Sequence, residues 1–218
     1  MSCAVGDLSS GVGLAEAVAD IDVIVHAASD SRNARVVDVQ GSQRLADAAR
    51  AAGVKHLIYV SIVGIDRIPF AYYQCKLEAE QIIAASGVPF SILRATQFHS
   101  FVAFLFSEAA RFPFVMPIPS GFWVQSVDVQ DVAARLGRAI DAGPKGLLPD
   151  FGGPEVLPIE EVAAQWLQRR PVGWLKPSVP IHVPGPIAAA FQAGYNTCPD
   201  GERGAVTWRE WLLRSMAE

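Results

Sequence analysis

The chain has 218 residues, of which 51% are hydrophobic and 18% charged, so it can bury a large core and we expect a globular protein. A net charge of −4 with scattered basic residues argues against a nucleic-acid partner, and three widely spaced cysteines, Cys3, Cys75 and Cys198, argue against a metal site and suit a reducing cytoplasm. No export signal is visible and no apolar run approaches the ~20 residues that span a bilayer, so no membrane partner is expected.

Short apolar runs alternate with longer segments of helical pattern, which is typical of βαβ units that build a parallel sheet. The pattern predicts a helix over 13–19, a buried strand over 23–25, a helix over 36–52 that ends at Gly53, and a strand over 55–60. A helix over 72–86 then ends at Gly87, and a strand over 88–93 follows it. The first part of the chain therefore predicts an α/β fold with a parallel sheet and flanking helices.

The second part of the chain has a less regular pattern. Its prolines and glycines predict an irregular excursion over 112–126. Asp128 is expected to cap a helix that runs to about 141, because its carboxylate can accept from the free N–H groups of the first turn. Beyond 150, the pattern predicts a small α+β cap made of a helix over 159–169, a strand over 179–183 and a closing helix around Trp208.

The most specific motif is the run Tyr72-Tyr73-Gln74-Cys75-Lys76, because Tyr72 and Lys76 are spaced i, i+4 and share one helix face. A lysine ammonium beside a phenol favours the phenolate and lowers the pKa of the tyrosine, as a general acid/base requires. Alone, the motif also fits an amphipathic helix with no chemistry. Ser61 favours chemistry, because it ends the preceding strand at the carboxyl edge of the sheet, where open α/β proteins bind ligands.

Small residues follow the first predicted strand of this region. Ala27, Ala28 and Ser29 permit the close approach of a flat ring or a ribose. Asp7 follows a short apolar run at Val5, which we take as a strand, and offers a carboxylate to an adenine amino group. His26 is better explained as a core or turn histidine than as a catalyst, since a neutral imidazole satisfies a buried polar position.

Six segments occur in the order seen in atypical short-chain dehydrogenases: GDL, VIVHAAS, YVSIVG, YYQCKLEAE, FSILRATQF and VDVQDVA. Over about 5–134, the chain therefore resembles the short-chain dehydrogenase/reductase superfamily in its NmrA-like branch. The resemblance implies a Rossmann-like NAD(P)-binding domain over 1–150, a cap of the same domain over 151–218, and NAD or NADP as the cofactor.

The resemblance also implies roles for single residues. On the cofactor side, Asp7 is expected to contact adenine, and Ala27, Ala28 and Ser29 to line the adenosine. At the reacting end, the expected residues are Ser61 and Tyr72 facing the substrate carbonyl, Lys76 on the nicotinamide ribose, and Thr96 near the nicotinamide carboxamide.

Members of this family are expected to carry a glycine-rich phosphate loop of the form GxxGxxG near the start of the chain. This motif occurs nowhere in the sequence. In the usual strand order, the strand before that loop lies between the strands represented here by Val5 and Val23, and Gly11-Val12-Gly13 lies in the wrong crossover to replace the loop. We therefore expect an N-terminally truncated domain with impaired pyrophosphate binding. Either the start lies inside a longer reading frame, which we favour, or the remaining strands repack.

Aromatic residues are concentrated in two later regions. The phenylalanines over 98–122 fit an apolar pocket over the nicotinamide and, equally, helix core packed on the cap. The later tryptophans, Trp166, Trp174, Trp208 and Trp211, predict cap core or a homodimer contact.

Taken together, these features predict an NAD(P)-dependent oxidoreductase that acts on a small carbonyl, alcohol or quinone-like compound. A non-catalytic NAD(P) sensor of NmrA-like type and a truncated, inactive paralogue are the alternatives. Tyr72 favours catalysis, because a sensor needs the lysine but not the phenol.

Overall fold

The computed structural model describes residues 3–169 and 176–215. The chain forms two compact units, one made of Met1–Arg94 with Ala134–Pro149 and the other of Ala95–Ala133 with Asp150–Glu218. The sequence places its domain boundary at 150, and the chain passes between the two units after Arg94, Ala133 and Pro149. Residues 95–133, which the sequence assigns to the first domain, lie in the second unit, because their apolar side chains pack against the C-terminal helices.

The first unit is built on parallel strand pairs. Strand β1 (Val23–His26) pairs in parallel with β2 (His56–Ile62), and β3 (Phe90–Ala95) is the next neighbour of β2 in the sheet. Strand β3 also pairs in parallel with β6 (Gly146–Leu147). The register places His26 opposite Tyr59, so the two side chains come from adjacent strands near the carboxyl end of β1.

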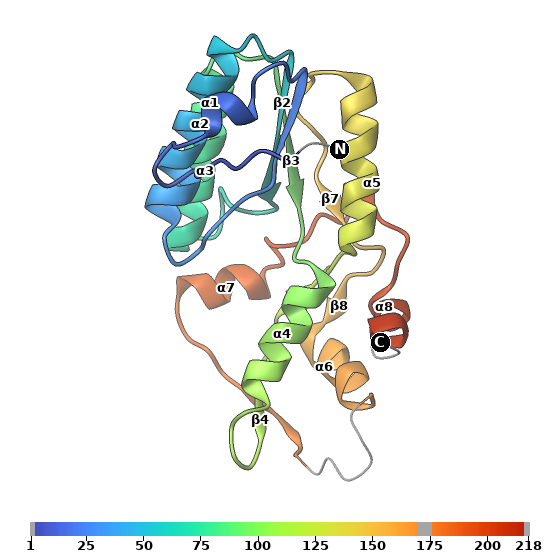
Figure 1. The fold of residues 1–218 in the computed structure, drawn as a ribbon. Helices are drawn as coiled ribbons and strands as arrows, with labels where there is room; N and C mark the ends of the chain where they lie inside the picture. Colours follow the sequence, from blue (N-terminus) through green and yellow to red (C-terminus); the bar gives the residue numbers. More distant parts are fainter. Residues whose placement is uncertain (1–2, 170–175, 216–218) are drawn as a thin grey trace. The chain divides into compact units, whose positions relative to one another are not determined.

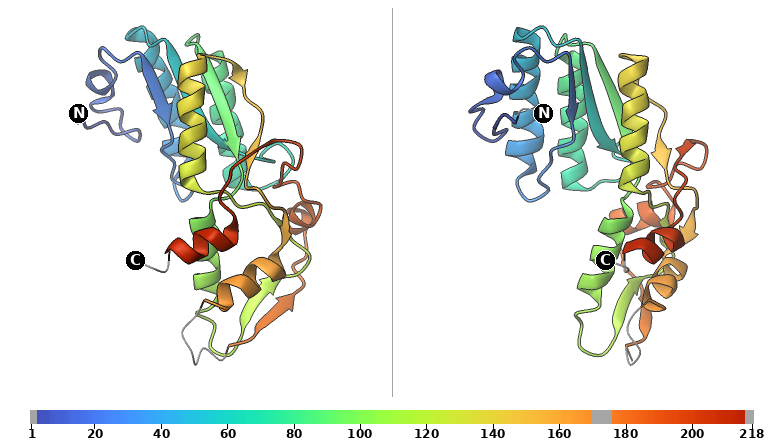
Figure 2. Two further views of the ribbon diagram at one scale, coloured as in Figure 1. Left: turned by 90° about the vertical axis from the view of Figure 1, so that its right-hand side faces the viewer. Right: turned by 45° about the vertical axis from the view of Figure 1, so that its right-hand side comes forward.

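Helices cover both faces of this sheet, with α2 and α3 on one face and the yellow helix α5 on the other (Figures 1 and 2). The core between the sheet and the first pair of helices contains Leu45, Ala49, Leu57, Ile83 and Ile92. The helical pattern of the sequence is confirmed here, and the bounds are α1 (Leu14–Ala17), the π-helical segment η1 (Arg35–Gln40), α2 (Gly41–Ala51), α3 (Ala71–Ala85) and α5 (Val129–Ala142). The predicted cap of α5 is also confirmed, because the Gln130 N–H donates to Asp128 Oδ1 at 2.7 Å.

Two predictions at the start of the chain are wrong. The strand β1 forms, but only His26 in it is buried and Val25 is 39% exposed, because among the described strands β1 pairs with β2 alone. The segment around Val5 is not a strand: Val5 is 90% exposed, and the Asp7 N–H donates to the Val12 carbonyl within a turn. No described strand offers this segment a partner.

The second unit combines short strand pairs with helices. Strand β4 (Met116–Pro119) pairs in parallel with β9 (Ser178–Ile181), β5 (Trp123–Val124) pairs antiparallel with β8 (Leu157–Pro158), and β7 (Phe151–Gly152) pairs in parallel with β10 (Glu202–Arg203). The excursion predicted over 112–126 therefore contains two strands. Its prolines are tolerated in β4, because among the described residues that strand pairs on one side only. The helices are α4 (His99–Ala109), α6 (Ile159–Leu167), α7 (Pro186–Gln192) and α8 (Trp208–Ser215).

Aromatic packing forms the core of this unit. Phe106 contacts the rings of Trp166 and Trp208, and Trp208 Nε1 donates to the Val162 carbonyl at 3.1 Å. The prediction of cap core is confirmed for Trp166 and Trp208, which are buried, whereas Trp174 lies outside the described residues. Helix core is likewise the correct alternative for Phe106.

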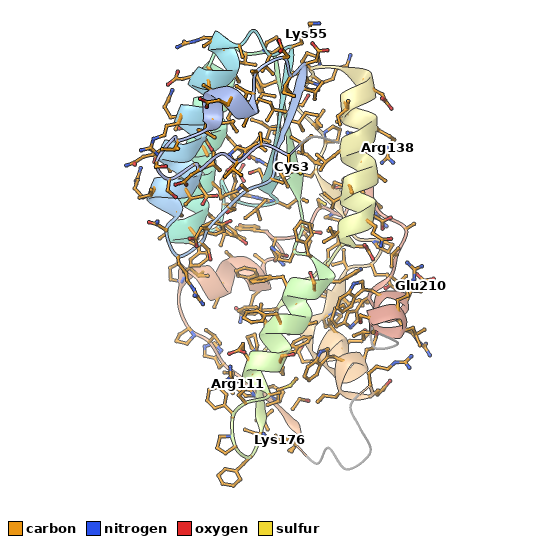
Figure 3. All side chains as sticks on the ribbon, viewed as in Figure 1. Cys3, Lys55, Arg111, Arg138, Lys176 and Glu210 are labelled. Atoms are coloured by element: carbon orange, nitrogen blue, oxygen red, sulfur yellow. The ribbon has the colours of Figure 1, made fainter. Side chains whose placement is uncertain are left out.

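At the far end of this unit, Lys176 donates to the carbonyls of Ala110 and Phe112, close to Arg111 (Figure 3). These bonds attach the segment before β9 to the end of α4. Within 3–169 and 176–215, no helix has the length and apolar character needed to cross a bilayer.

Candidate active site

The hydroxyl of Tyr72 lies beside the loop that follows β1. Tyr72 is in the first turn of α3, which begins after the extended residue Phe70, and the Phe70 ring contacts the Tyr72 ring edge-on. Tyr72 Oη is 2.7 Å from Ser29 Oγ in a hydrogen bond on the exposed side of the unit. The half-buried phenol is therefore held at a fixed place where a ligand can reach it.

Ser29 connects the phenol to a buried carboxylate. Its Oγ donates to Asp38 Oδ1 at 2.5 Å, while Asp38 Oδ2 accepts from the Asp30 N–H at 3.2 Å. Asp38 is fully buried in the π-helical segment η1. A buried carboxylate is costly unless it is paired and hydrogen-bonded, and these bonds to the loop after β1 satisfy part of that requirement.

Lys76 provides the charge that balances Asp38. Its Nζ lies 3.7 Å from Asp38 Oδ1, donates to the Val60 carbonyl at 2.9 Å, and stands 4.2 Å from the centre of the Tyr59 ring. Lys76 is 4% exposed, and burial lowers the pKa of its ammonium to about 8 despite the opposing effects of Asp38 and Glu80. Lys76 and Tyr72 share a helix side as predicted, but Lys76 pairs with the carboxylate.

The prediction that Lys76 lowers the pKa of Tyr72 is wrong in direction. Burial raises the pKa of the phenol, and the negative charges of Asp38 and Asp30 raise it further. A hydrogen bond from Ser29 to a phenolate opposes this rise, but Ser29 would have to give up Asp38 to donate it. Tyr72 is therefore held as a neutral phenol at neutral pH.

Ser61 lies in β2, where its side chain is buried, and its Oγ has no hydrogen-bond partner among the described residues. Tyr59, two residues earlier in the same strand, is fully buried and its Oη also lacks a described partner. Buried hydroxyls are normally hydrogen-bonded, so each is available to a bound water or ligand. Proximity of Ser61 to Tyr72 remains a prediction.

His26 has a packing role, as the sequence favours. It is 3% exposed, its Nε2 lies 2.9 Å from Ser42 Oγ, and its ring contacts Tyr59. Burial, with a smaller effect from the positive charge of Lys76, lowers the pKa of His26 to about 4. The imidazole is therefore neutral at physiological pH and serves as a buried polar partner for α2.

The residues assigned to the cofactor differ in what they offer. Ala27, Ala28 and Ser29 are exposed directly after β1, so the backbone there is open to a flat ring or a ribose. The carboxylate of Asp7 accepts from the Ser9 N–H and from Ser10 Oγ, which lowers the pKa of Asp7. The roles of these residues toward a cofactor remain predictions.

Thr96 belongs to the second unit. It is buried, its N–H donates to the Phe151 carbonyl at 3.0 Å, and its Oγ1 has no partner among the described residues. Its predicted contact with a carboxamide therefore remains a prediction.

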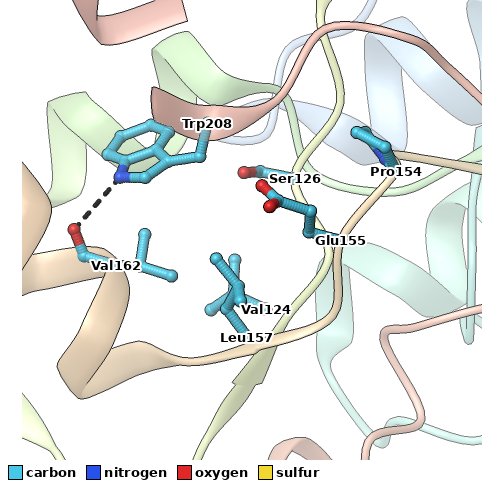
Figure 4. A pocket seen from close by; sticks show the side chains of 7 residues that line it. All are labelled: Val124, Ser126, Pro154, Glu155, Leu157, Val162 and Trp208. Carbon is cyan, nitrogen blue, oxygen red and sulfur yellow. Dashed lines mark hydrogen bonds between the residues drawn. The ribbon is translucent and has the colours of Figure 1, made fainter. Parts of the chain in front are cut away.

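A small cavity lies within the second unit, bordered by Ser126, Glu155 and Trp208 (Figure 4). Its volume of ≈ 10 Å³ is about that of a single water site. Ser126 Oγ is 2.8 Å from His99 Nδ1, and His99 Nε2 is 3.1 Å from the Val206 carbonyl, so the pair is fully used in holding the segment before α8. The cavity is too small for an organic substrate.

Asp38, the residue that joins Ser29 and Lys76, was not predicted from the sequence. A signal was present, because Asp38 lies one turn before Ser42 on the helix side that carries Leu45 and Ala49. A carboxylate on an apolar helix face requires a buried partner, and the lysine of the YxxxK motif was the candidate with the matching charge.

The model of the NAD(P)H-binding family matches residues 1–140. This range contains β1, β2 and α3, and also the linked side chains of Ser29, Asp38, Tyr72 and Lys76. The chain belongs to the NAD(P)H-binding family. The prediction of NAD or NADP as cofactor is thereby confirmed at the level of the family.

Two relatives are named as a reductase and an oxidoreductase. The chain is 29% identical over 177 residues to (4-alkanoyl-5-oxo-2,5-dihydrofuran-3-yl)methyl phosphate reductase of Streptomyces griseus, covering 75% of this chain and 62% of that protein. It is 27% identical over 121 residues to quinone oxidoreductase 2 of Escherichia coli, covering 55% of this chain and 42% of the relative. The chain thus spans less than two thirds of the length of either relative.

Solved structures share the fold. The NADPH complex of quinone oxidoreductase QOR2 from Escherichia coli has a TM-score of 0.76 at 17% identity, over 97% of this chain and 82% of that one. Triphenylmethane reductase from Citrobacter sp., solved with NADP(H), has a TM-score of 0.67 at 18% identity, over 96% of this chain and 77% of the other. The predicted fold class, a Rossmann-like parallel α/β sheet with flanking helices, is confirmed.

Proposed function

We propose that this chain carries the catalytic site of an NAD(P)H-dependent reductase of the short-chain dehydrogenase/reductase type, NmrA-like branch, acting on a small carbonyl or quinone-like compound. The observation that carries the proposal is the position of the Tyr72 hydroxyl, which is reachable from solvent and bonded to Ser29 at the carboxyl end of β1. Ligands of open α/β proteins bind at that edge. The names of the two reductase relatives support the same class of reaction.

The residues have distinct roles in this proposal. A dinucleotide held at this site would provide the hydride for reduction of the carbonyl or quinone. Tyr72 donates its proton to the oxygen that becomes negative, and its raised pKa keeps that proton in place at neutral pH. Ser61 orients the substrate oxygen with its unused hydroxyl, and Lys76 places a positive charge 3.7 Å from the Asp38 carboxylate that accepts from Ser29.

On the cofactor side, the exposed residues Ala27, Ala28 and Ser29 would hold the adenosine part, with Asp7 at the adenine. Lys76 Nζ is already engaged by the Val60 carbonyl and by Asp38. Its contribution is therefore mainly electrostatic, through the network rather than by an open contact.

The proposal is tested with the Tyr72→Phe variant. NADPH or NADH fluorescence titration measures binding, and absorbance at the nicotinamide band measures turnover with simple quinones and small aldehydes. We expect Tyr72→Phe to retain binding and to lose turnover by about 10²- to 10⁴-fold, the usual contribution of a general acid. Unchanged turnover in Tyr72→Phe would remove the mechanism.

One observation favours a non-catalytic NAD(P) sensor as the second candidate. Burial raises the pKa of Tyr72, so the lowered pKa expected of a phenolate base is not present. A sensor predicts cofactor binding with no turnover of any quinone or carbonyl by the unmodified chain, and no change in binding for Tyr72→Phe.

A further inference from the structure

The fully buried carboxylate of Asp38 determines the direction of the hydrogen bond between Ser29 and Tyr72. A serine hydroxyl has a single proton, and Ser29 donates it to Asp38 Oδ1, because an ionised carboxylate can only accept. Ser29 can therefore serve only as acceptor toward Tyr72 Oη, which is 2.7 Å away. The phenolic proton of Tyr72 points at Ser29 in this arrangement.

We propose that Asp38 is a positioning residue for Tyr72: acting through Ser29, it keeps the phenol protonated and in place, and so adapts the site to reduction rather than to alcohol oxidation. The inference rests on the proposed function and names a residue that the YxxxK motif does not contain. Asp38 touches neither substrate nor cofactor in this proposal. It orders the loop after β1 through Ser29 and the Asp30 N–H.

The local backbone supports a specific role for Asp38. The residue lies in a six-residue π-helical segment, Arg35–Gln40, immediately before the regular helix α2. Such segments are rare and occur frequently at functional sites, because the wider turn moves a side chain out of helical register. Here the segment includes the carboxylate that bonds Ser29.

The electrostatic effect on Tyr72 has a definite sign. The titratable groups that act electrostatically on Tyr72 are Asp38 of η1, Asp30 of the loop after β1 and Cys75 of α3, and Tyr72 in turn acts on Tyr59 of β2. Above pH 8, Lys76 is largely neutral, so the charge of Asp38 is then unbalanced and opposes ionisation of the phenol. Replacing Asp38 by asparagine removes that charge and frees Ser29 to donate to a phenolate. Both changes stabilise the phenolate.

The test is a spectroscopic titration of tyrosinate near 295 nm on the full chain, with the Tyr72 step identified by subtracting the same titration of Tyr72→Phe. We expect Asp38→Asn to move the Tyr72 midpoint down by about one pH unit or more, the usual effect of a nearby like charge. The movement should be smaller in the Ser29→Ala background, because part of the effect passes through Ser29. No movement, or an equal movement in both backgrounds, overturns the proposal.

The matched control is Glu80→Gln, which removes another buried carboxylate from the same unit. Glu80 accepts hydrogen bonds from Arg94, and Arg94 also lies 3.3 Å from Asp66, so this arginine still has a carboxylate partner after the substitution. We therefore expect the Tyr72 midpoint to stay unchanged in Glu80→Gln. If Asp38→Asn does not fold, the double variant Asp38→Asn/Lys76→Met replaces it. Both buried charges are removed in the double variant, so neither remains without its partner. The same downward movement is expected there, and its absence overturns the proposal.

The reduction rate provides a second reading. Because the acid form of Tyr72 is required, we expect the alkaline limb of kcat to move down in Asp38→Asn by the same amount as the optical midpoint. If Tyr72→Phe turns over like the unmodified chain, the proposed function fails while the optical titration still decides the role of Asp38. If the optical midpoint is unmoved while Tyr72→Phe is inactive, only the role of Asp38 fails.

Discussion

Lys76 and Asp38 form a buried ion pair, with Nζ 3.7 Å from Oδ1 and side chains that are 5% and 0% exposed. The pair connects α3 to η1 beneath the loop that carries Ser29. Desolvation makes a buried pair a poor source of net stability, but removal of a single partner leaves the other charge uncompensated. The two residues are therefore coupled in both folding and function.

The first prediction concerns this pair. Lys76→Met should lower the free energy of unfolding by about 3 kcal/mol at pH 7, because it leaves the Asp38 carboxylate buried without a counter-charge. The double variant with Asp38→Asn should cost less than Lys76→Met alone. Urea unfolding of the four proteins measures the coupling, and strictly additive losses would show that the two charges do not interact.

Ser61 allows stability and activity to be separated. Its hydroxyl is buried with no described partner, so Ser61→Ala removes an unsatisfied polar group and should leave the free energy of unfolding unchanged within about 0.5 kcal/mol, or raise it. Turnover should nevertheless fall, if the hydroxyl orients a substrate oxygen. A clear loss of stability in urea would mean that Ser61 has a structural partner.

His26 predicts a pH effect with a definite sign. Its folded pKa of about 4 lies below the ordinary value of 6.5, so this group's contribution to stability is full above pH 6.5 and is lost as the pH falls toward 4. Relative to His26→Gln, the wild-type chain should lose about 3 kcal/mol between pH 7 and pH 4. The subtraction removes the contributions of His56 and His99, whose pKa values are also lowered by burial. A pH-independent difference in urea unfolding would contradict the neutral, buried imidazole.

The sequence predicted most elements of the first unit because each has a local signal. Gly53 and Gly87 adopt positive φ directly after α2 and α3, as expected for glycines that end helices. The burial of β1 was not predictable in the same way, since it depends on which strands lie beside it. The failed strand at Val5 has the same cause, because an apolar run becomes a strand only where a neighbouring edge is available.

The candidate site was predictable in composition but not in its pairings. Periodicity placed Tyr72 and Lys76 on one helix side, and the end of a strand placed Ser61 at the sheet edge. Which acceptor Lys76 chooses depends on Asp38, more than thirty positions away in the sequence, and on a π-helical turn that no local pattern announces. Because the pairing of Lys76 with Asp38 was not predicted, the direction of the pKa change at Tyr72 was predicted wrongly.

Gly153 directly follows β7 in the second unit. A Cβ built on Gly153 would lie 1.8 Å from the Ser126 carbonyl oxygen, so the two backbone segments approach too closely for any side chain. Gly153→Ala should therefore lower the free energy of unfolding by about 1–3 kcal/mol or more, as overpacking does.

The control for Gly153→Ala is Gly137→Ala within α5, where the added Cβ meets nothing within 4 Å. Alanine is the better helix former, so this variant should be more stable by about 0.5–1 kcal/mol. If the free energy of unfolding falls in Gly153→Ala and rises in Gly137→Ala, the close approach at Gly153, rather than the loss of glycine flexibility, determines the change in stability. A neutral Gly153→Ala would mean that the Ser126 segment can move away at no cost, and the hydrogen bond from Ser126 to His99 would then be expected to lengthen.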